Sequence, residues 1–154
     1  AGRHRGAARE LFKHPKVVAL KHTNTNMYEL ERLLAHNPSL IALNGYDEAF
    51  LSGLSMGATG MIGSTVNFMA KKFMALRAAF RQGKQGEALR LQSEANEIVE
   101  VLVEVGVFNA VKYAMILRGI DCGECRRPFK PLGATEKARV QAVLEKNLGE
   151  ALRI

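Results

Sequence analysis

The sequence predicts an α/β fold in which a parallel sheet is covered by helices, and two observations carry this prediction. Short apolar runs alternate three times with helical segments between residues 17 and 82. Each run is followed directly by polar residues that end a strand, and glycine accompanies them after the second and third runs. Such alternation is typical of a parallel sheet, because each helix returns the chain to the start of the next strand. After Gly83 the strands stop, and the rest of the chain is expected to be helical.

Local signals set the bounds of the expected elements. Asn26 and Glu29 are placed to form a capping box at the start of helix 27–36. Gly57 is placed to cap the C-terminus of helix 48–56. Thr135 is placed to cap the N-terminus of the last helix, 136–152. In chain order we expect helix 7–14, strand 17–23, helix 27–36, strand 39–45, helix 48–56, strand 59–64, a helix from 67 to about 82, and helices 87–105, 107–117 and 136–152.

Composition narrows the class of protein. The 154 residues are 47% hydrophobic and 24% charged, as in a globular domain with its own core. No apolar run approaches the ~20 residues that span a bilayer, and the basic N-terminus has no apolar segment behind it, so we expect no membrane contact, no signal peptide and a cytoplasmic location. The net charge of +7 suits an anionic small molecule. Nucleic acid is not expected, because the basic residues are not interleaved with aromatic ones.

The two cysteines, Cys122 and Cys125, are spaced Cys-Gly-Glu-Cys. One such pair is half of a zinc site, and neither a second pair nor a nearby histidine completes it. A redox pair would open a helix after a strand, whereas this pair precedes a segment that is typical of a loop. We therefore expect two reduced loop thiols and no metal.

The strand over residues 17–23 is expected to be buried, and its apolar run ends on Lys21. Side chains alternate along a strand, so Ala19, Lys21 and Thr23 share one face, while Leu20 and His22 point to the other. Parallel α/β folds place their chemistry at the carboxyl ends of strands. There a partly desolvated lysine amine can attack a carbonyl and form a Schiff base. The alternative is an ordinary solvated lysine at a strand end.

Polar clusters follow all three strands at the same point. They are Lys21 and Thr23, then Gly45, Asp47 and Glu48, then Gly63, Ser64 and Thr65. Because the carboxyl ends of parallel strands lie at one edge of the sheet, the three clusters predict a ligand site. Asp47 and Ser64 remain open to a second interpretation, since either could simply cap the helix that follows it.

An ordered set of segments resembles the family of Schiff-base aldolases that contains dihydrodipicolinate synthases and N-acetylneuraminate lyases. The matching segments are residues 19–23, 44–48, 57–67, 105–108 with Lys112, and 125–129. The resemblance covers nearly the whole chain after about Glu10. Residues 45–48 and 63–65 resemble the branch that cleaves sialic acid.

The resemblance implies a (β/α)8 barrel of which this chain is the C-terminal portion. Residues 1–83 would form a partial barrel of about three strands, and residues 84–154 the last barrel helix region and a helical extension, in one structural unit without a linker. Three parallel strands leave an open edge and an uncovered apolar inner face. We therefore expect the chain to self-associate into a homo-oligomer, to misfold, or to be part of a larger chain.

The resemblance also implies a reaction and roles. Lys21 would form an imine with N-acetylneuraminate, which is cleaved to N-acetylmannosamine and pyruvate, with no other cofactor. The implied substrate contacts are Thr23 beside the imine, Asp47 and Glu48 on the sugar hydroxyls, Gly45 and Gly63 where backbone approaches the ligand, and Ser64 as a hydrogen-bonding group. The alternatives are an aldolase for another 2-keto acid and a non-catalytic structural module.

Two parts of the family site have no match in this sequence. One is the Gly-Ser/Thr segment that holds the pyruvate carboxylate, and the other is the tyrosine that acts as general acid and base. The tyrosines present, Tyr28, Tyr46 and Tyr113, do not match that motif. Correct positioning of the reacting groups can lower the activation barrier by ~7–11 kcal/mol. Without these two parts of the site, the isolated chain is expected to be a poor catalyst.

Overall fold

The computed structural model describes residues 10–152, and the chain divides into two compact units. The first unit ends at Ile62 and the second begins at Gly63, earlier in the chain than the expected division at residue 83. The start of the expected helix 7–14 lies outside the described residues, and residues 10–12 are helical.

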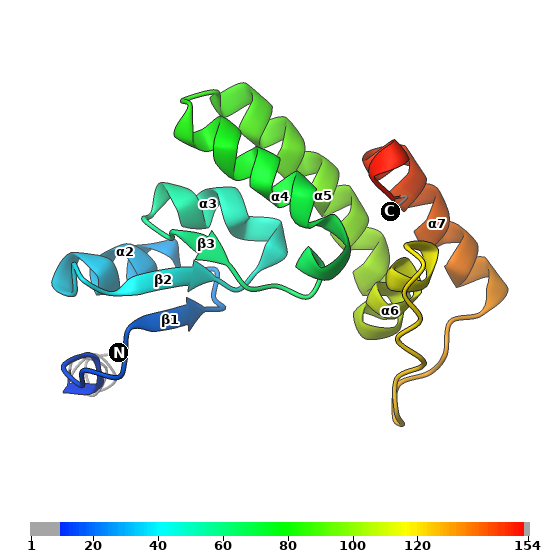
Figure 1. Ribbon diagram of the computed structural model, residues 1–154, viewed down its shortest axis with the longest axis horizontal. Coiled ribbons are helices and arrows are strands. Elements are labelled where there is room, and N and C mark those ends of the chain that lie inside the picture. Colours follow the sequence, from blue (N-terminus) through cyan, green and yellow to red (C-terminus); the bar gives the residue numbers. More distant parts are fainter. Residues whose placement is uncertain (1–9, 153–154) are drawn as a thin grey trace. The chain divides into compact units, whose positions relative to one another are not determined.

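The first unit holds a parallel sheet of three strands in the order β1-β2-β3 (Figure 1). The strands are β1 (Ala19–His22), β2 (Ile41–Asn44) and β3 (Gly60–Met61). The predicted parallel sheet is confirmed, but each strand is shorter than predicted. Apolar runs mark where a strand lies, whereas its length depends on the neighbour it bonds, and β2 is the neighbour of both outer strands.

Helices cover one face of this sheet. They are α2 (Met27–His36), the 3-10 turn η1 (Asp47–Ala49) and α3 (Phe50–Ser55). The core beneath them consists of Leu30, Ala42 and Ala58, with Leu20, Met27 and Leu34 packed against it. Leu30 is fully buried, and burying such a side chain stabilises the unit by about 1.5–3 kcal/mol.

The other face of the sheet is exposed. The register pairs Ala19 with Ile41 and Lys21 with Leu43 on this face. Ala19 and Lys21 are exposed, and Ile41 retains 45% of its accessible surface. The prediction of a buried strand at residues 17–23 is therefore wrong for this face, and the prediction of an uncovered apolar inner face is confirmed.

The capping box at α2 is half present. The side chain of Asn26 accepts a hydrogen bond from the backbone N–H of Glu29 at 3.1 Å, as predicted. The backbone N–H of Asn26 donates to the side-chain oxygen of Asn24 at 3.0 Å and not to Glu29. An asparagine two residues earlier reaches this donor through a short local turn. Gly57 follows the end of α3 with a φ of +98°, as its predicted capping role requires.

The second unit contains the predicted run of helices. They are α4 (Val66–Arg81), α5 (Gln85–Val105), α6 (Val107–Leu117) and α7 (Ala134–Leu148), followed by the 3-10 turn η2 (Gly149–Leu152). The N-cap of α7 is Gly133, so the predicted cap at Thr135 is wrong. The last helix also ends earlier than predicted, because Gly149 takes a φ of +52° that an α-helix does not accommodate. None of the helices that the structure describes is long and apolar enough to cross a membrane.

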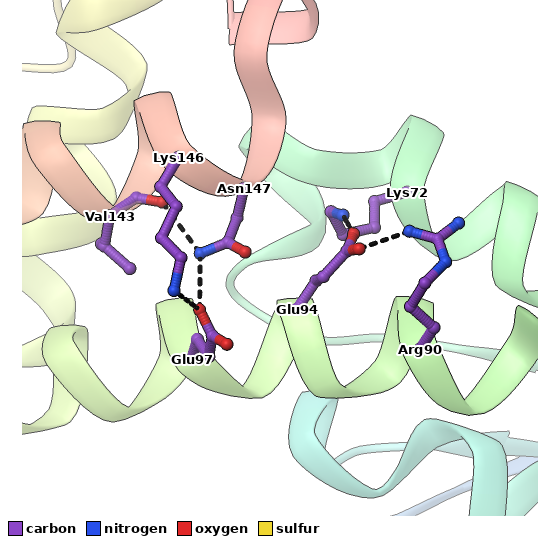
Figure 2. A network of polar contacts seen from close by, with 7 residues as sticks. All are labelled: Lys72, Arg90, Glu94, Glu97, Val143, Lys146 and Asn147. Atoms are coloured by element: carbon purple, nitrogen blue, oxygen red, sulfur yellow. Dashed lines mark hydrogen bonds and ion pairs between the residues drawn. The ribbon is translucent and has the colours of Figure 1, made fainter.

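A buried ammonium group joins α4 to α5. The side chain of Lys72 is only 8% exposed and pairs with the carboxylate of Glu94, which also binds Arg90 (Figure 2). The hydrogen bond from Lys72 is the main reason why the pKa of Glu94 lies below its ordinary value of 4.5. One turn along α5, Glu97 makes a similar but exposed pair with Lys146 of α7 at 2.7 Å.

Replacing Glu94 with glutamine is expected to destabilise the chain by about 3 kcal/mol, because it leaves the Lys72 ammonium buried without its counter-ion. Urea unfolding of the 154-residue chain at pH 7 measures this change. Glu97→Gln is the matched control on the same helix, and it should change the unfolding free energy little, since exposed pairs contribute little.

The acid dependence has a defined sign. A carboxyl whose pKa is lowered by folding stabilises the folded state fully above its ordinary value of 4.5, and this contribution is lost as the pH falls through the lowered pKa. The unsubstituted chain should therefore lose stability below pH 4.5 more steeply than Glu94→Gln. Equal acid slopes, or equal losses for Glu94→Gln and Glu97→Gln, would contradict the role of the buried pair.

Candidate active site

The loops after the strands of the first unit begin at one edge of its sheet. The backbone N–H of Gly45 donates to the carbonyl of His22 at 2.8 Å, and the N–H of Ile62 donates to the carbonyl of Asn44 at 2.9 Å. These bonds extend the parallel ladder beyond the ends of the strands. The carboxyl ends of the three strands are thereby held side by side, as the sequence predicts.

Lys21, Thr23 and Gly45 lie against one another at this edge. A methyl group added to Gly45 would be 2.0 Å from the hydroxyl oxygen of Thr23 and 3.0 Å from Cε of Lys21. Glycine is therefore needed here to give room to two side chains of the site, which is a different reason from the expected approach of backbone to ligand. Lys21 is exposed, so the described residues do not provide the expected desolvation.

The two carboxylates after β2 have different environments. Asp47 is the first residue of η1 and is buried, with 6% of its surface exposed, whereas Glu48 is exposed. Tyr46 occupies the N-cap position, so the interpretation of Asp47 as a helix cap is wrong. Because Glu48 reaches the solvent, it is the carboxylate that a bound molecule can contact directly.

Gly63 and Ser64 belong to the second unit, where Gly63 is half-buried and Ser64 is exposed. Thr65 occupies the N-cap position of α4, so the alternative of Ser64 as a helix cap is also wrong. The carbonyl of Ser64 accepts a hydrogen bond from the side-chain amide of Asn67 at 2.8 Å. This bond fixes the backbone that carries the Ser64 hydroxyl.

Ser64 lines a cavity of about 550 Å³ in the second unit. No other residue that lines this cavity was predicted to belong to the site, although three of them are basic. Besides Ser64, its walls are made by Asn67, Phe108, Val111, Lys112, Glu124, Cys125, Arg126, Arg127 and Phe129. Its cationic walls suit an anionic or hydroxyl-rich ligand. Lys112 and residues 125–129, which carry part of the family resemblance, were the signal for it in the sequence.

The loop that carries the cysteines is tied to α6. The ammonium of Lys112 donates to the carbonyls of Cys122 and Glu124 at 2.8 and 3.1 Å. Asn109 accepts a hydrogen bond from the backbone N–H of Cys125 at 3.2 Å. Both thiols are free, so the prediction of two loop thiols is confirmed. Within residues 10–152, no group of three or more His, Cys, Asp or Glu side chains could hold a metal ion.

The sequence is similar to proteins of one known family. Residues 6–147 match the model of the dihydrodipicolinate synthetase family. The N-acetylneuraminate lyase of Rhizobium meliloti (strain 1021) is 42% identical over 132 residues, which cover 86% of this chain and 44% of that protein. The N-acetylneuraminate lyase of Enterobacter sp. (strain 638) is 37% identical over 137 residues, which cover 88% of this chain and 46% of that protein.

Solved structures of N-acetylneuraminate lyases are also similar to this chain. The N-acetylneuraminate lyase from Fusobacterium nucleatum complexed with pyruvate superimposes with a TM-score of 0.87 at 28% identity, covering 96% of this chain and 49% of that one. The lyase from Clostridium difficile in complex with mannosamine gives a TM-score of 0.86 at 28% identity, with 90% and 48% covered.

The chain spans less than half the length of the curated relatives that it matches. Its three parallel strands with their helices correspond to the C-terminal portion of a (β/α)8 barrel, as predicted. Because the family model matches most of the sequence, the chain belongs to the dihydrodipicolinate synthetase family.

Proposed function

We propose that this chain carries the Schiff-base lysine of an aldolase that cleaves N-acetylneuraminate to N-acetylmannosamine and pyruvate. The observation that carries the proposal is the contact of Gly45 with both Lys21 and Thr23 at the carboxyl edge of a parallel sheet. Relatives named N-acetylneuraminate lyase support the choice of substrate, as do the related structures that hold pyruvate and mannosamine.

In the proposed reaction the neutral amine of Lys21 attacks the C2 ketone of the open-chain sugar acid, and water leaves as the imine forms. The C4 hydroxyl then gives its proton to a base while the C3–C4 bond breaks. The electron pair of the C3–C4 bond moves into the protonated imine, and N-acetylmannosamine leaves as the aldehyde. The resulting enamine takes a proton at C3, and water hydrolyses the imine to release pyruvate and the free amine.

The other site residues would hold the substrate. Thr23 places a hydroxyl beside Lys21, and Glu48 offers acceptor oxygens to the sugar hydroxyls. The role of Ser64 as a hydrogen-bonding group stays a prediction. In this proposal, the base and the group that binds the pyruvate carboxylate come from the part of the family barrel that this chain does not span. The imine on Lys21 takes the place of a separate cofactor.

A chimaera tests this function. We define the completed chain as residues 10–152 joined to the N-terminal half of the Rhizobium meliloti relative, and pyruvate release is its assay. The completed chain should cleave N-acetylneuraminate in preference to a 2-keto-3-deoxy sugar acid without the N-acetyl group. The reverse preference would indicate an aldolase for another 2-keto acid. A folded completed chain that cleaves neither substrate would indicate a structural module.

Glu48→Ala in the completed chain should raise KM for N-acetylneuraminate about tenfold or more, because a charged hydrogen-bond acceptor for the sugar is lost. Asp47→Ala should act in the same direction. Trapping of pyruvate by borohydride should be unchanged, since pyruvate has no sugar tail. Glu87→Ala is the matched control, because Glu87 is exposed in the first turn of α5. Equal losses with pyruvate and with the sugar would refute the assignment to the sugar hydroxyls.

A further inference from the structure

A buried amide at the end of β2 has no place in the reaction described above. Asn44 is the last residue of β2 and is fully buried. The strand before it, residues 41–43, is apolar, and an apolar side chain would ordinarily fill such a position under a helix. A buried amide is costly unless its hydrogen bonds are made, so its partners indicate why it is present.

The amide nitrogen of Asn44 donates to the backbone carbonyl of Tyr46. Tyr46 is the N-cap of η1, and its carbonyl also accepts the backbone N–H of Ala49 at 3.2 Å. One carbonyl therefore links the end of the strand to the turn that carries Asp47 and Glu48. Only Gly45 and Tyr46 lie between the strand and the turn, and Gly45 contacts Lys21.

The amide group is held in place by α3. A methyl group on Gly53 would be 2.5 Å from the side-chain oxygen of Asn44 and 2.8 Å from its Cγ. The bare Cα of Gly53 thus leaves just enough space for the amide. The side-chain oxygen of Asn44 has no hydrogen-bond partner among the described residues. The bond to Tyr46 is therefore the interaction that accounts for a polar side chain at this position.

We propose that Asn44 is a positioning residue, which fixes turn η1 to the end of β2 and thereby holds Glu48 at a set place relative to Lys21. This inference rests on the proposed function, because it assigns to Asn44 the orientation of the carboxylates that bind the sugar. Asn44 itself touches neither the sugar nor the reacting atoms. The side-chain bond constrains the turn, while the Lys21 strand keeps its own ladder bonds to β2.

Two variants of the completed chain separate positioning from stability. Asn44→Asp keeps the shape but replaces the donor with an oxygen that repels the Tyr46 carbonyl. Asn44→Leu removes the polar atoms, but its larger side chain meets Gly53, so we expect it to lower the midpoint of urea unfolding while the chain still folds. Both variants should raise KM for N-acetylneuraminate about tenfold, as expected when a charge-bearing contact is misplaced, and both should keep pyruvate trapping at Lys21.

The matched control is Asn37→Asp. The amide of Asn37 also donates to a backbone carbonyl, that of Leu33 at 2.8 Å, but it lies before β2 at the end of α2. This variant should leave KM unchanged. In the 154-residue chain, Asn44→Leu should also speed hydrogen exchange of the Ala49 amide, whereas Asn37→Asp should not.

Unchanged KM and unchanged Ala49 exchange in Asn44→Leu would overturn the proposal. If Asn44→Asp does not fold, Asn44→Leu decides alone, since a purely structural role predicts no rise in KM for a variant that still folds and still traps pyruvate. Failure of the proposed function is recognised separately, because the unsubstituted completed chain would then form no pyruvate adduct on Lys21.

Discussion

Lys21→Arg is expected to reduce cleavage of N-acetylneuraminate by the completed chain at least about a thousandfold, because the step that needs a covalent imine is lost. Arginine keeps the positive charge and the length of the side chain, but its guanidinium stays protonated and does not attack a carbonyl. The measurement is kcat from pyruvate release. The effect should appear in kcat, because the covalent step itself is removed.

Lys16→Arg is the control for this variant. Lys16 is an exposed lysine shortly before β1, and the same substitution there should leave kcat unchanged. A Lys21→Arg variant that retained more than about a tenth of the activity would show that another group supplies the nucleophile.

Gly45→Ala is expected to impair both the fold and the chemistry. The new methyl group would be 2.0 Å from the hydroxyl oxygen of Thr23 and 2.8 Å from its Cβ, so the Thr23 backbone or rotamer must move. Overpacking of this kind costs about 1–3 kcal/mol. A misplacement of ~1 Å near a reacting group can cost on the order of a hundredfold in rate, so pyruvate trapping should slow by more than the stability loss explains.

Gly60→Ala is the matched control for Gly45→Ala. Gly60 lies on β3 of the same sheet, and a methyl group there would be 3.4 Å from Cδ2 of Leu43, an ordinary contact. Its unfolding midpoint in urea and its trapping rate should stay close to those of the unsubstituted completed chain. Similar behaviour of the two glycine variants would contradict the specific contact of Gly45 with Lys21 and Thr23.

Features that depend on local sequence could be predicted well. The alternation of apolar runs and helices gave the order of the elements and the parallel sheet, and the start and end of α6 are as predicted. The cap at Asn26 was predictable because it depends on residues three apart. The start of the last helix could not be predicted in this way, since the choice of Gly133 over Thr135 as N-cap depends on how the preceding loop enters the helix.

Some features of the candidate site could likewise be predicted from the sequence, and others could not. It could be predicted from the sequence that Lys21, Thr23 and Gly45 lie close together, because the register of parallel strands aligns the strand ends. The burial of Asp47 and the bond from Asn44 to Tyr46 could not, since both depend on how α3 packs on the sheet. The exposure of Lys21 was not predicted either. The sequence predicted a partly desolvated amine, but desolvation requires groups from outside the three strands.

The central claim is that Lys21 forms the imine, and trapping tests it most directly. The completed chain is incubated with pyruvate and borohydride, and the reduced adduct is located by peptide mass mapping. The expected result is a single pyruvyl adduct on Lys21 that is absent from Lys21→Arg and present in Lys16→Arg. An adduct on another lysine, such as Lys112, or no adduct on a folded completed chain, would contradict the claim.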